Sequence, residues 1–212
     1  MPPRPALVLF DLDGVLADYD RAIRCAWLAT TCGASSAAVY EALFGGRGLE
    51  LPSDRGDIGL SGYLARLQAR HGWHIAAPDF LAARRAATTV DLGMRALCDR
   101  LAGQAALAVF SNNGRWVEGH AADIVPALMP RFAGRIVCSG SLRRLKPEPA
   151  AYVACLARLG GEPATTLFVD DRQDNVDGAR AAGLDAIHFE GVERLRDDLT
   201  TRGFDIGDGD AI

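Results

Sequence analysis

Two pairs of aspartates stand directly after apolar runs in this chain. Asp11 and Asp13 follow the run at residues 7–10, and Asp170 and Asp171 follow a second run. Carboxylates within a few ångströms of one another repel and raise each other's pKa unless a cation lies between them. Mg²⁺ is a hard cation that binds through one or two protein carboxylates and keeps water or phosphate oxygens as further ligands. The two pairs therefore predict a Mg²⁺ site.

Three further residues have the chemistry to hold a phosphate group. Ser111 and Asn112 follow another apolar run, and Lys146 opens the segment Lys-Pro-Glu-Pro. A lysine offers a phosphate a point charge and a serine offers it a hydroxyl donor. Beside a metal-binding set of carboxylates, these groups predict phosphoryl chemistry.

Five short apolar runs are expected to form the strands that position these residues, at 7–10, 105–110, 135–138, 166–169 and 186–189. From residue 92 they alternate with helical patterns at 92–101, 116–128, 150–159 and 176–182. Strands that alternate with helices predict an α/β fold with a doubly wound parallel sheet. Ligands bind beyond the carboxyl ends of such strands, so we expect the polar residues to meet at one edge of the sheet.

The segment from residue 18 to residue 90 has a different pattern. It holds helical spacings at 21–32, 37–44, 62–71 and 78–88 and no convincing strand. We therefore expect a small all-helical cap at 18–90, inserted after the first strand into a core made of 1–17 and 91–212. The Gly45-Gly46-Arg47-Gly48 stretch does not follow a strand and lacks the lysine of a phosphate-binding loop, so it is expected to be a plain connection.

Composition narrows the class of protein. The chain has 212 residues, 49% of them hydrophobic, and a net charge of −4, which predicts one sizeable core with a small appended domain and no nucleic-acid or anionic-membrane partner. The absence of an 18-residue apolar segment and of a signal peptide predicts a cytoplasmic address. We expect solvated faces for the scattered or paired arginines Arg47, Arg55, Arg84, Arg85, Arg143 and Arg144.

The remaining candidates for chemistry receive no role. Five cysteines without a CxxC pair indicate neither a disulfide framework nor a zinc site. The four histidines have no partners at ligand spacing. The acidic, glycine-rich end at 203–212 is expected to be a frayed tail whose Asp205, Asp208 and Asp210 are solvated.

Four motifs occur in order at the expected strand ends: DLDGV at 11–15, Ser-Asn at 111–112, KPEP at 146–149 and VDDRQDN at 169–175. In this order the chain resembles the haloacid dehalogenase-like (HAD) superfamily hydrolases, in the subfamily with a helical C1-type cap. The resemblance spans residues 8–189 and implies a Rossmann-like core.

The resemblance implies the catalytic roles. Asp11 matches the nucleophile, which forms an aspartyl-phosphate, and Asp13 matches the general acid and base. Ser111, Asn112 and Lys146 match the groups that steady the transferring phosphoryl group, and Lys146 also restrains the nucleophile.

The resemblance also implies a Mg²⁺ cofactor. Asp11, Asp13 through its backbone carbonyl, and Asp171 match the metal ligands. Asp170 matches a neighbour that acts through water, and Asn175 matches a residue that supports the ligands. The presence of Asp13 favours phosphoryl transfer over carbon–halogen cleavage.

The motifs leave several readings open. The resemblance favours a Mg²⁺-dependent phosphatase that acts on a small phosphomonoester through an aspartyl-phosphate on Asp11. A sugar-phosphate mutase of the β-phosphoglucomutase type would share every motif. A non-catalytic binding protein on the same fold is a third reading, against which the intact set of Asp11, Asp13, Lys146 and Asp171 argues.

A cap of about 70 residues favours a small phosphorylated metabolite, such as a sugar phosphate or nucleoside monophosphate, for a monomer or homodimer. Candidate substrate contacts are Tyr19, Trp27, Phe44, Arg47, Asn113 and Arg115, although Trp27 and Phe44 have the character of cap core.

Overall fold

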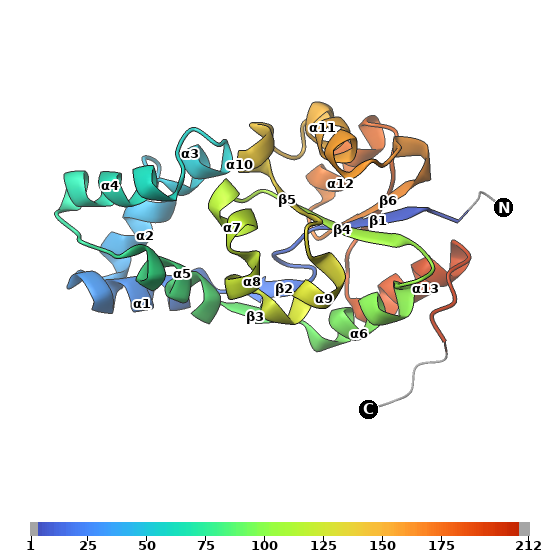
Figure 1. The fold of residues 1–212 in the computed structure, drawn as a ribbon, viewed down its shortest axis with the longest axis horizontal. Helices are drawn as coiled ribbons and strands as arrows, with labels where there is room; N and C mark the ends of the chain where they lie inside the picture. The colour runs from blue at the N-terminus through green and yellow to red at the C-terminus, as the bar shows by residue number, and fades with distance from the viewer. Residues whose placement is uncertain (1–3, 208–212) are drawn as a thin grey trace.

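A computed structural model describes residues 4–207, in which an α/β core lies beside a helical cap (Figure 1). The core sheet has the strand order β5-β4-β1-β6-β7, and every neighbouring pair is parallel. Its strands are β1 (Leu7–Phe10), β4 (Ala106–Ser111), β5 (Ile136–Cys138), β6 (Thr166–Asp170) and β7 (Asp185–His188). The predicted parallel, doubly wound sheet is confirmed.

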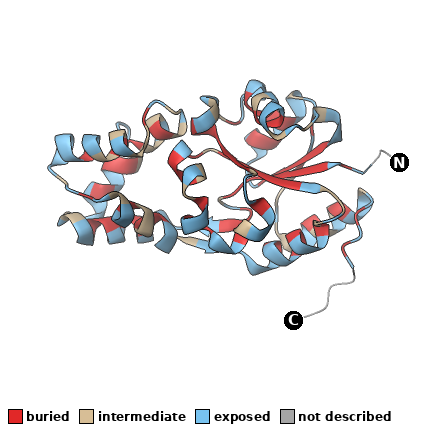
Figure 2. Ribbon diagram, in the orientation of Figure 1, coloured by how far each residue is buried: buried red, intermediate tan, exposed pale blue. Residues whose placement is uncertain are grey.

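The sheet forms because its strands are apolar on both faces. Val8 and Phe10 of β1 pack into one hydrophobic cluster, whereas Leu7 and Leu9 pack into another on the opposite face. All four side chains are buried, and Figure 2 shows the central strands buried along nearly their whole length. A continuous apolar run is what a strand covered by helices on both faces requires.

Helices cover both faces of the sheet (Figure 1). On one face lie α11 (Pro149–Leu159) and α12 (Gln173–Ala181), and on the other α6 (Leu92–Leu101) and α13 (Val192–Thr201). The shorter core helices are α7 (Arg115–Gly119), α8 (Ala121–Ile124), η1 (Pro126–Leu128), α9 (Met129–Phe132), α10 (Ser139–Leu142) and η2 (Pro163–Thr165). Within residues 4–207, no helix combines the length and the apolar character needed to cross a membrane.

The single helix predicted over 116–128 is broken into pieces. His120 has φ −122° and ψ 23°, and Val125 has φ −129° and ψ 58°, so neither residue continues a helix. Val125 precedes Pro126, and the proline ring disfavours helical backbone at the residue before it. The hydrophobic pattern across this stretch therefore belongs to separate short turns.

The cap consists of α1 (Arg21–Cys32), α2 (Ser36–Phe44), α3 (Glu50–Asp54), α4 (Leu60–His71) and α5 (Ala77–Ala86). The expectation that residues 18–90 hold no strand is wrong at both ends of the segment. Here β2 (Ala17–Tyr19) and β3 (Thr88–Val90) pair in an antiparallel manner as the chain leaves the core and returns. Three-residue strands carry too short a pattern to be recognised in a sequence.

The end of the chain is more ordered than the sequence predicts. Phe204 and Ile206 are buried in the core cluster, so the expectation of a frayed tail is wrong for these residues. The Gln104 side chain also donates to the carbonyl of Asp205 (2.7 Å) and accepts from its N–H (2.9 Å). Asp205 itself is exposed as expected, and Asp208 and Asp210 lie outside the described residues.

The variant Phe204→Ala tests this packing. Truncation of a buried phenylalanine removes apolar contacts and leaves a cavity, so we expect the free energy of unfolding to fall by about 3 kcal/mol. Urea denaturation measures the change, with the exposed Asp205→Ala as the matched control. A midpoint for Phe204→Ala equal to that of the control would contradict the docked end.

Candidate active site

The predicted residues meet at the carboxyl edge of the sheet. Phe10 is in register with Val109 of β4 and Val169 of β6, so Asp11 follows β1 between the ends of its two neighbours. The Asp11 N–H donates to the carbonyl of Val169 (2.9 Å). A cavity of about 1070 Å³ opens at this edge, and its lining includes Asp11, Asp13, Ser111, Asn112, Lys146, Asp171 and Asn175. Asp170 lies buried beside them.

Lys146 is the positive charge of this edge. Its Nζ lies 3.0 Å from Asp11 Oδ1 and 2.6 Å from Asp170 Oδ2, and its side chain is fully buried. Burial disfavours a charged ammonium, but the charges of Asp11 and Asp170 outweigh burial and raise the pKa of Lys146. Lys146 therefore holds both carboxylates by charge-assisted hydrogen bonds.

Asp170 is held entirely by protein donors. Asn175 Nδ2 lies 2.9 Å and 3.1 Å from its two carboxylate oxygens, and the N–H of Arg172 donates to Oδ1 (2.9 Å). Tyr152 in turn donates from its hydroxyl to the carbonyl of Asn175 (2.6 Å). With both oxygens engaged, Asp170 fixes Lys146 in place.

Asn112 lines the cavity, and its side chain binds the backbone of Lys146. The amide donates to the carbonyl of Lys146 (2.8 Å) and accepts from the N–H of Lys146 (2.9 Å). This reciprocal pair satisfies two backbone groups of a partly buried loop. The Asn112 side chain therefore orients Lys146, and a direct amide contact to phosphate is not what this geometry provides.

Asp13 is held from two sides. Arg84 Nη2 lies 2.7 Å from each oxygen of its carboxylate, and Asn113 Nδ2 donates to Oδ2 (3.0 Å). Asn113 also donates to Ser111 Oγ (2.9 Å). Arg84 is buried, so its predicted place on a solvated face is wrong. Nothing in the sequence around Arg84 indicates that its partner is a residue 71 positions away.

The acidic groups of this edge fit a hard cation. Asp11, Asp170 and Asp171 each offer an oxygen within 4.8 Å of the others. Burial, followed by the charges of Asp170 and Asp13, raises the pKa of Asp11 to about 7 against the opposing effect of Lys146. Since Asp170 is already engaged by Lys146 and Asn175, Asp11 and Asp171 are the carboxylates that would hold Mg²⁺.

Gly14 lets the loop after β1 lie close to Asp171, which follows β6. Its φ is +89°, and a Cβ at this position would lie 2.5 Å from Asp171 Oδ2. Only glycine gives the turn after Asp13 both this backbone conformation and this closeness.

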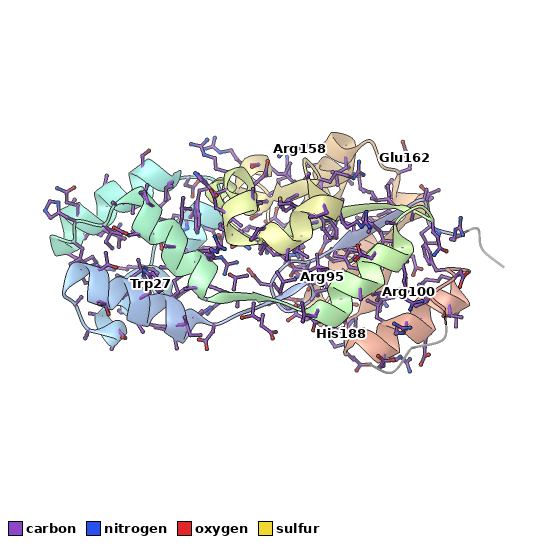
Figure 3. All side chains as sticks on the ribbon, turned by 60° about the horizontal axis from the view of Figure 1, so that its bottom comes forward. Trp27, Arg95, Arg100, Arg158, Glu162 and His188 are labelled. Atoms are coloured by element: carbon purple, nitrogen blue, oxygen red, sulfur yellow. The ribbon has the colours of Figure 1, made fainter. Side chains whose placement is uncertain are left out.

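The structure also places residues that sequence analysis treated as substrate contacts or left without a role. His188, which received no role, has Nε2 2.9 Å from the carbonyl of Asp171, beyond the end of β6 (Figure 3). Of the candidate substrate contacts, Tyr19, Phe44 and Asn113 line the cavity, and Arg47 lines an adjoining cavity of about 980 Å³ in the cap. Trp27 is half exposed on α1 (Figure 3) and, like Arg115, is not among the lining residues of either cavity.

A parallel sheet with polar side chains gathered at its carboxyl edge is an α/β arrangement in which ligands bind at the switch point. The chain belongs to the haloacid dehalogenase-like hydrolases, because the model of that family matches residues 5–183.

Solved structures share the fold. A predicted HAD-like family hydrolase from Porphyromonas gingivalis has a TM-score of 0.75 at 21% identity, over 94% of this chain and 98% of the other. A HAD family enzyme from Bacteroides thetaiotaomicron, in complex with magnesium and inorganic phosphate, has a TM-score of 0.70 at 20% identity, over 90% and 98%.

One curated relative matches part of the chain. It is the chloroplastic flavin mononucleotide hydrolase 1 of Arabidopsis thaliana, 35% identical over 69 residues. The match spans 32% of this chain and 28% of that protein.

The raised pKa of Asp11 predicts a pH-dependent affinity for Mg²⁺. The cation needs an ionised carboxylate, and without metal Asp11 is increasingly protonated as the pH falls below about 7. We expect Mg²⁺ to bind about tenfold more weakly at about pH 6 than at about pH 8. Isothermal titration calorimetry measures both affinities. In Asp11→Asn the binding should be weaker and lose this pH dependence, and an unchanged slope would assign it to another group.

Loss of Lys146 should destabilise the fold. In Lys146→Met two buried carboxylates would lose their shared cation, and removal of one partner from a buried ion pair costs about 3–5 kcal/mol. Urea denaturation at about pH 8 checks this expectation. The double variant Lys146→Met/Asp170→Asn, which also removes one of the two carboxylates, should recover part of the loss. If Lys146→Met unfolds at the wild-type midpoint, the ion pairs do not stabilise this edge.

Proposed function

We propose that this hydrolase is a Mg²⁺-dependent phosphatase that hydrolyses a small phosphomonoester through an aspartyl-phosphate on Asp11. The observation that carries the proposal is the environment of the Asp11 carboxylate. The N–H of Leu12 donates to Oδ1 (2.7 Å), and Lys146 Nζ lies 3.0 Å from the same oxygen. Among the described residues, none donates to Oδ2. Asp11 thus has one anchored oxygen and one left for a ligand or for attack.

The chemistry divides between two aspartates. Asp11 attacks phosphorus, the bond from phosphorus to the ester oxygen breaks, and that oxygen takes a proton from Asp13. Asp13 then removes a proton from water, the hydroxide attacks the phosphorus of the aspartyl-phosphate, and inorganic phosphate leaves with Asp11 regenerated. A bound Mg²⁺ would offset the charge between the carboxylates and the phosphate. Lys146 and the Ser111 hydroxyl would hold the remaining phosphate oxygens.

Two comparisons support this reaction. The relative from Arabidopsis thaliana is named for the hydrolysis of flavin mononucleotide, which is a phosphomonoester. The enzyme from Bacteroides thetaiotaomicron binds magnesium and inorganic phosphate, the cofactor and product proposed here. A cavity of about 1070 Å³ is large enough for a sugar phosphate or a nucleotide.

The cap, residues 18–90, is proposed to act as a lid over this reaction. The cavity lies between cap and core, because Tyr19, Phe44 and Glu50 line it opposite Asp11 and Asp171. A lid in this place excludes bulk water from the aspartyl-phosphate and contacts the leaving group.

Phosphate release from a panel of phosphomonoesters tests the proposal. The panel contains p-nitrophenyl phosphate, sugar phosphates, nucleoside monophosphates and flavin mononucleotide, each with Mg²⁺ and with EDTA. We expect Mg²⁺-dependent release that falls about 10³-fold or more in Asp11→Asn. The control Asp177→Asn removes a carboxylate from the exposed face of α12 and should behave as wild type. Release that persists in Asp11→Asn would remove Asp11 as the nucleophile.

A further inference from the structure

We propose that Arg84 is a positioning residue that makes the orientation of Asp13 depend on the packing of the cap against the core. The proposal rests on the proposed phosphatase function, in which Asp13 is the general acid and base. Its basis is that the two donors to the Asp13 carboxylate come from different parts of the molecule. Arg84 lies in the last turn of α5 in the cap, and Asn113 follows β4 in the core.

The Arg84 contact has the geometry of a strong ion pair. One nitrogen, Nη2, lies 2.7 Å from both oxygens of Asp13, and the side chain of Arg84 is only 1% exposed. The guanidinium also stacks on the ring of Tyr19, with Cζ 3.6 Å from the ring centroid. The buried Arg84 has little room to rearrange, and its contact with both oxygens holds the partly exposed carboxylate of Asp13 in the orientation in which it meets Arg84.

Among the described residues, no other hydrogen bond of the Arg84 side chain accounts for a charged residue at this position. Its Nε and Nη1 are buried and have no hydrogen-bond partner among the described residues. Burial of a charged group costs free energy, which the ion pair with Asp13 and the stacking on Tyr19 offset here, and an apolar side chain of similar size is often equally stable in such a place. The polar contact that distinguishes Arg84 from an apolar residue is its contact with Asp13.

Arg24 is a natural comparison within the same cap. It is equally buried, also lacks partners for two of its nitrogens, and stacks on Phe80 with Cζ 4.7 Å from the ring centroid. Its ion pair, however, is with Glu50 of the cap (2.8 Å). Arg24 also donates from Nη1 to the Tyr19 hydroxyl (2.8 Å). The ion pair of Arg24 thus stays within the cap, whereas that of Arg84 connects the cap to a proposed catalytic group.

The location of Arg84 ties it to the connection between cap and core. Thr88, the first residue of β3, donates from its hydroxyl to the carbonyl of Arg84 (2.8 Å). Any movement of α5 about the paired strands β2 and β3 would displace the guanidinium from Asp13. Asp13 would then keep only Asn113, and its orientation would no longer be fixed from both sides.

A misplaced Asp13 should lower kcat/KM most for substrates whose leaving group needs a proton. The p-nitrophenolate ion leaves without protonation, whereas the alkoxide of an alkyl phosphate needs a proton from the general acid. In Arg84→Met we expect kcat/KM for an alkyl phosphate to fall about 10²-fold and that for p-nitrophenyl phosphate to fall less than about tenfold. The ratio of the two values is the readout, because a general loss of folded enzyme would lower both equally.

Two further variants complete the experiment. Arg85→Met removes the exposed arginine next to Arg84 on α5 and should leave the ratio of the two kcat/KM values as in wild type. Arg84→Lys keeps the charge and should recover part of the alkyl phosphate activity. Equal losses for both substrates in Arg84→Met, or a shift of the ratio in Arg85→Met of the same size, would overturn the proposal.

A double-mutant cycle judges the contact independently of activity. Arg84→Met and Asp13→Asn, alone and together, are compared by urea denaturation. Non-additive changes in the free energy of unfolding support the Arg84–Asp13 contact, and additive changes overturn it. A wild-type enzyme without Asp11-dependent phosphate release would count against the phosphatase function, and the cycle would still decide whether Arg84 and Asp13 are coupled.

Discussion

The central constraint in this protein is the concentration of negative charge at one edge of a buried sheet. Three carboxylates, Asp11, Asp170 and Asp171, approach within 4.8 Å, and a single ammonium, that of Lys146, lies against two of them. Three carboxylates and one ammonium have a net charge of −2 when all are ionised, which a divalent cation would balance. Without a cation, partial protonation of Asp11, whose pKa is about 7, relieves part of this repulsion. The binding of a metal and the ionisation of the proposed nucleophile are therefore linked.

The sheet topology produces this concentration of charge. β1 is the central strand. The chain passes from it to β4 and β5 on one side, and from β5 it returns across the sheet to β6 and β7 on the other. At such a switch point the loops after neighbouring strands diverge and leave a crevice. Asp11 and Asp171 directly follow β1 and β6, and Ser111 ends β4, so all three residues lie at that crevice. The apolar strands and their helices provide the rigid support, so short loops suffice to position the reacting groups.

Whether a feature could be predicted from the sequence depends on how far apart in the chain its interacting residues lie. The parallel sheet and the carboxylate pairs were predictable, because an apolar run and the residue after it are adjacent in the chain. The Asp13–Arg84 contact and the buried Phe204 were not, since each depends on segments that only the fold brings together. The partners of the Asn112 amide could not be predicted for a related reason. Its residue type suits a phosphate ligand, but a loop 34 residues away takes both of its hydrogen-bonding groups.

The position of Arg84 separates two tasks of the cap. The cap residues that line the cavity, such as Phe44 and Glu50, lie in α2 and α3. Arg84 lies at the other end of the cap, where α5 leads into β3 and the core. Changes in the first group alter the shape and polarity of the cavity and leave the Asp13 contact in place. With the proposed roles, substrate preference can therefore change while Arg84 continues to orient Asp13.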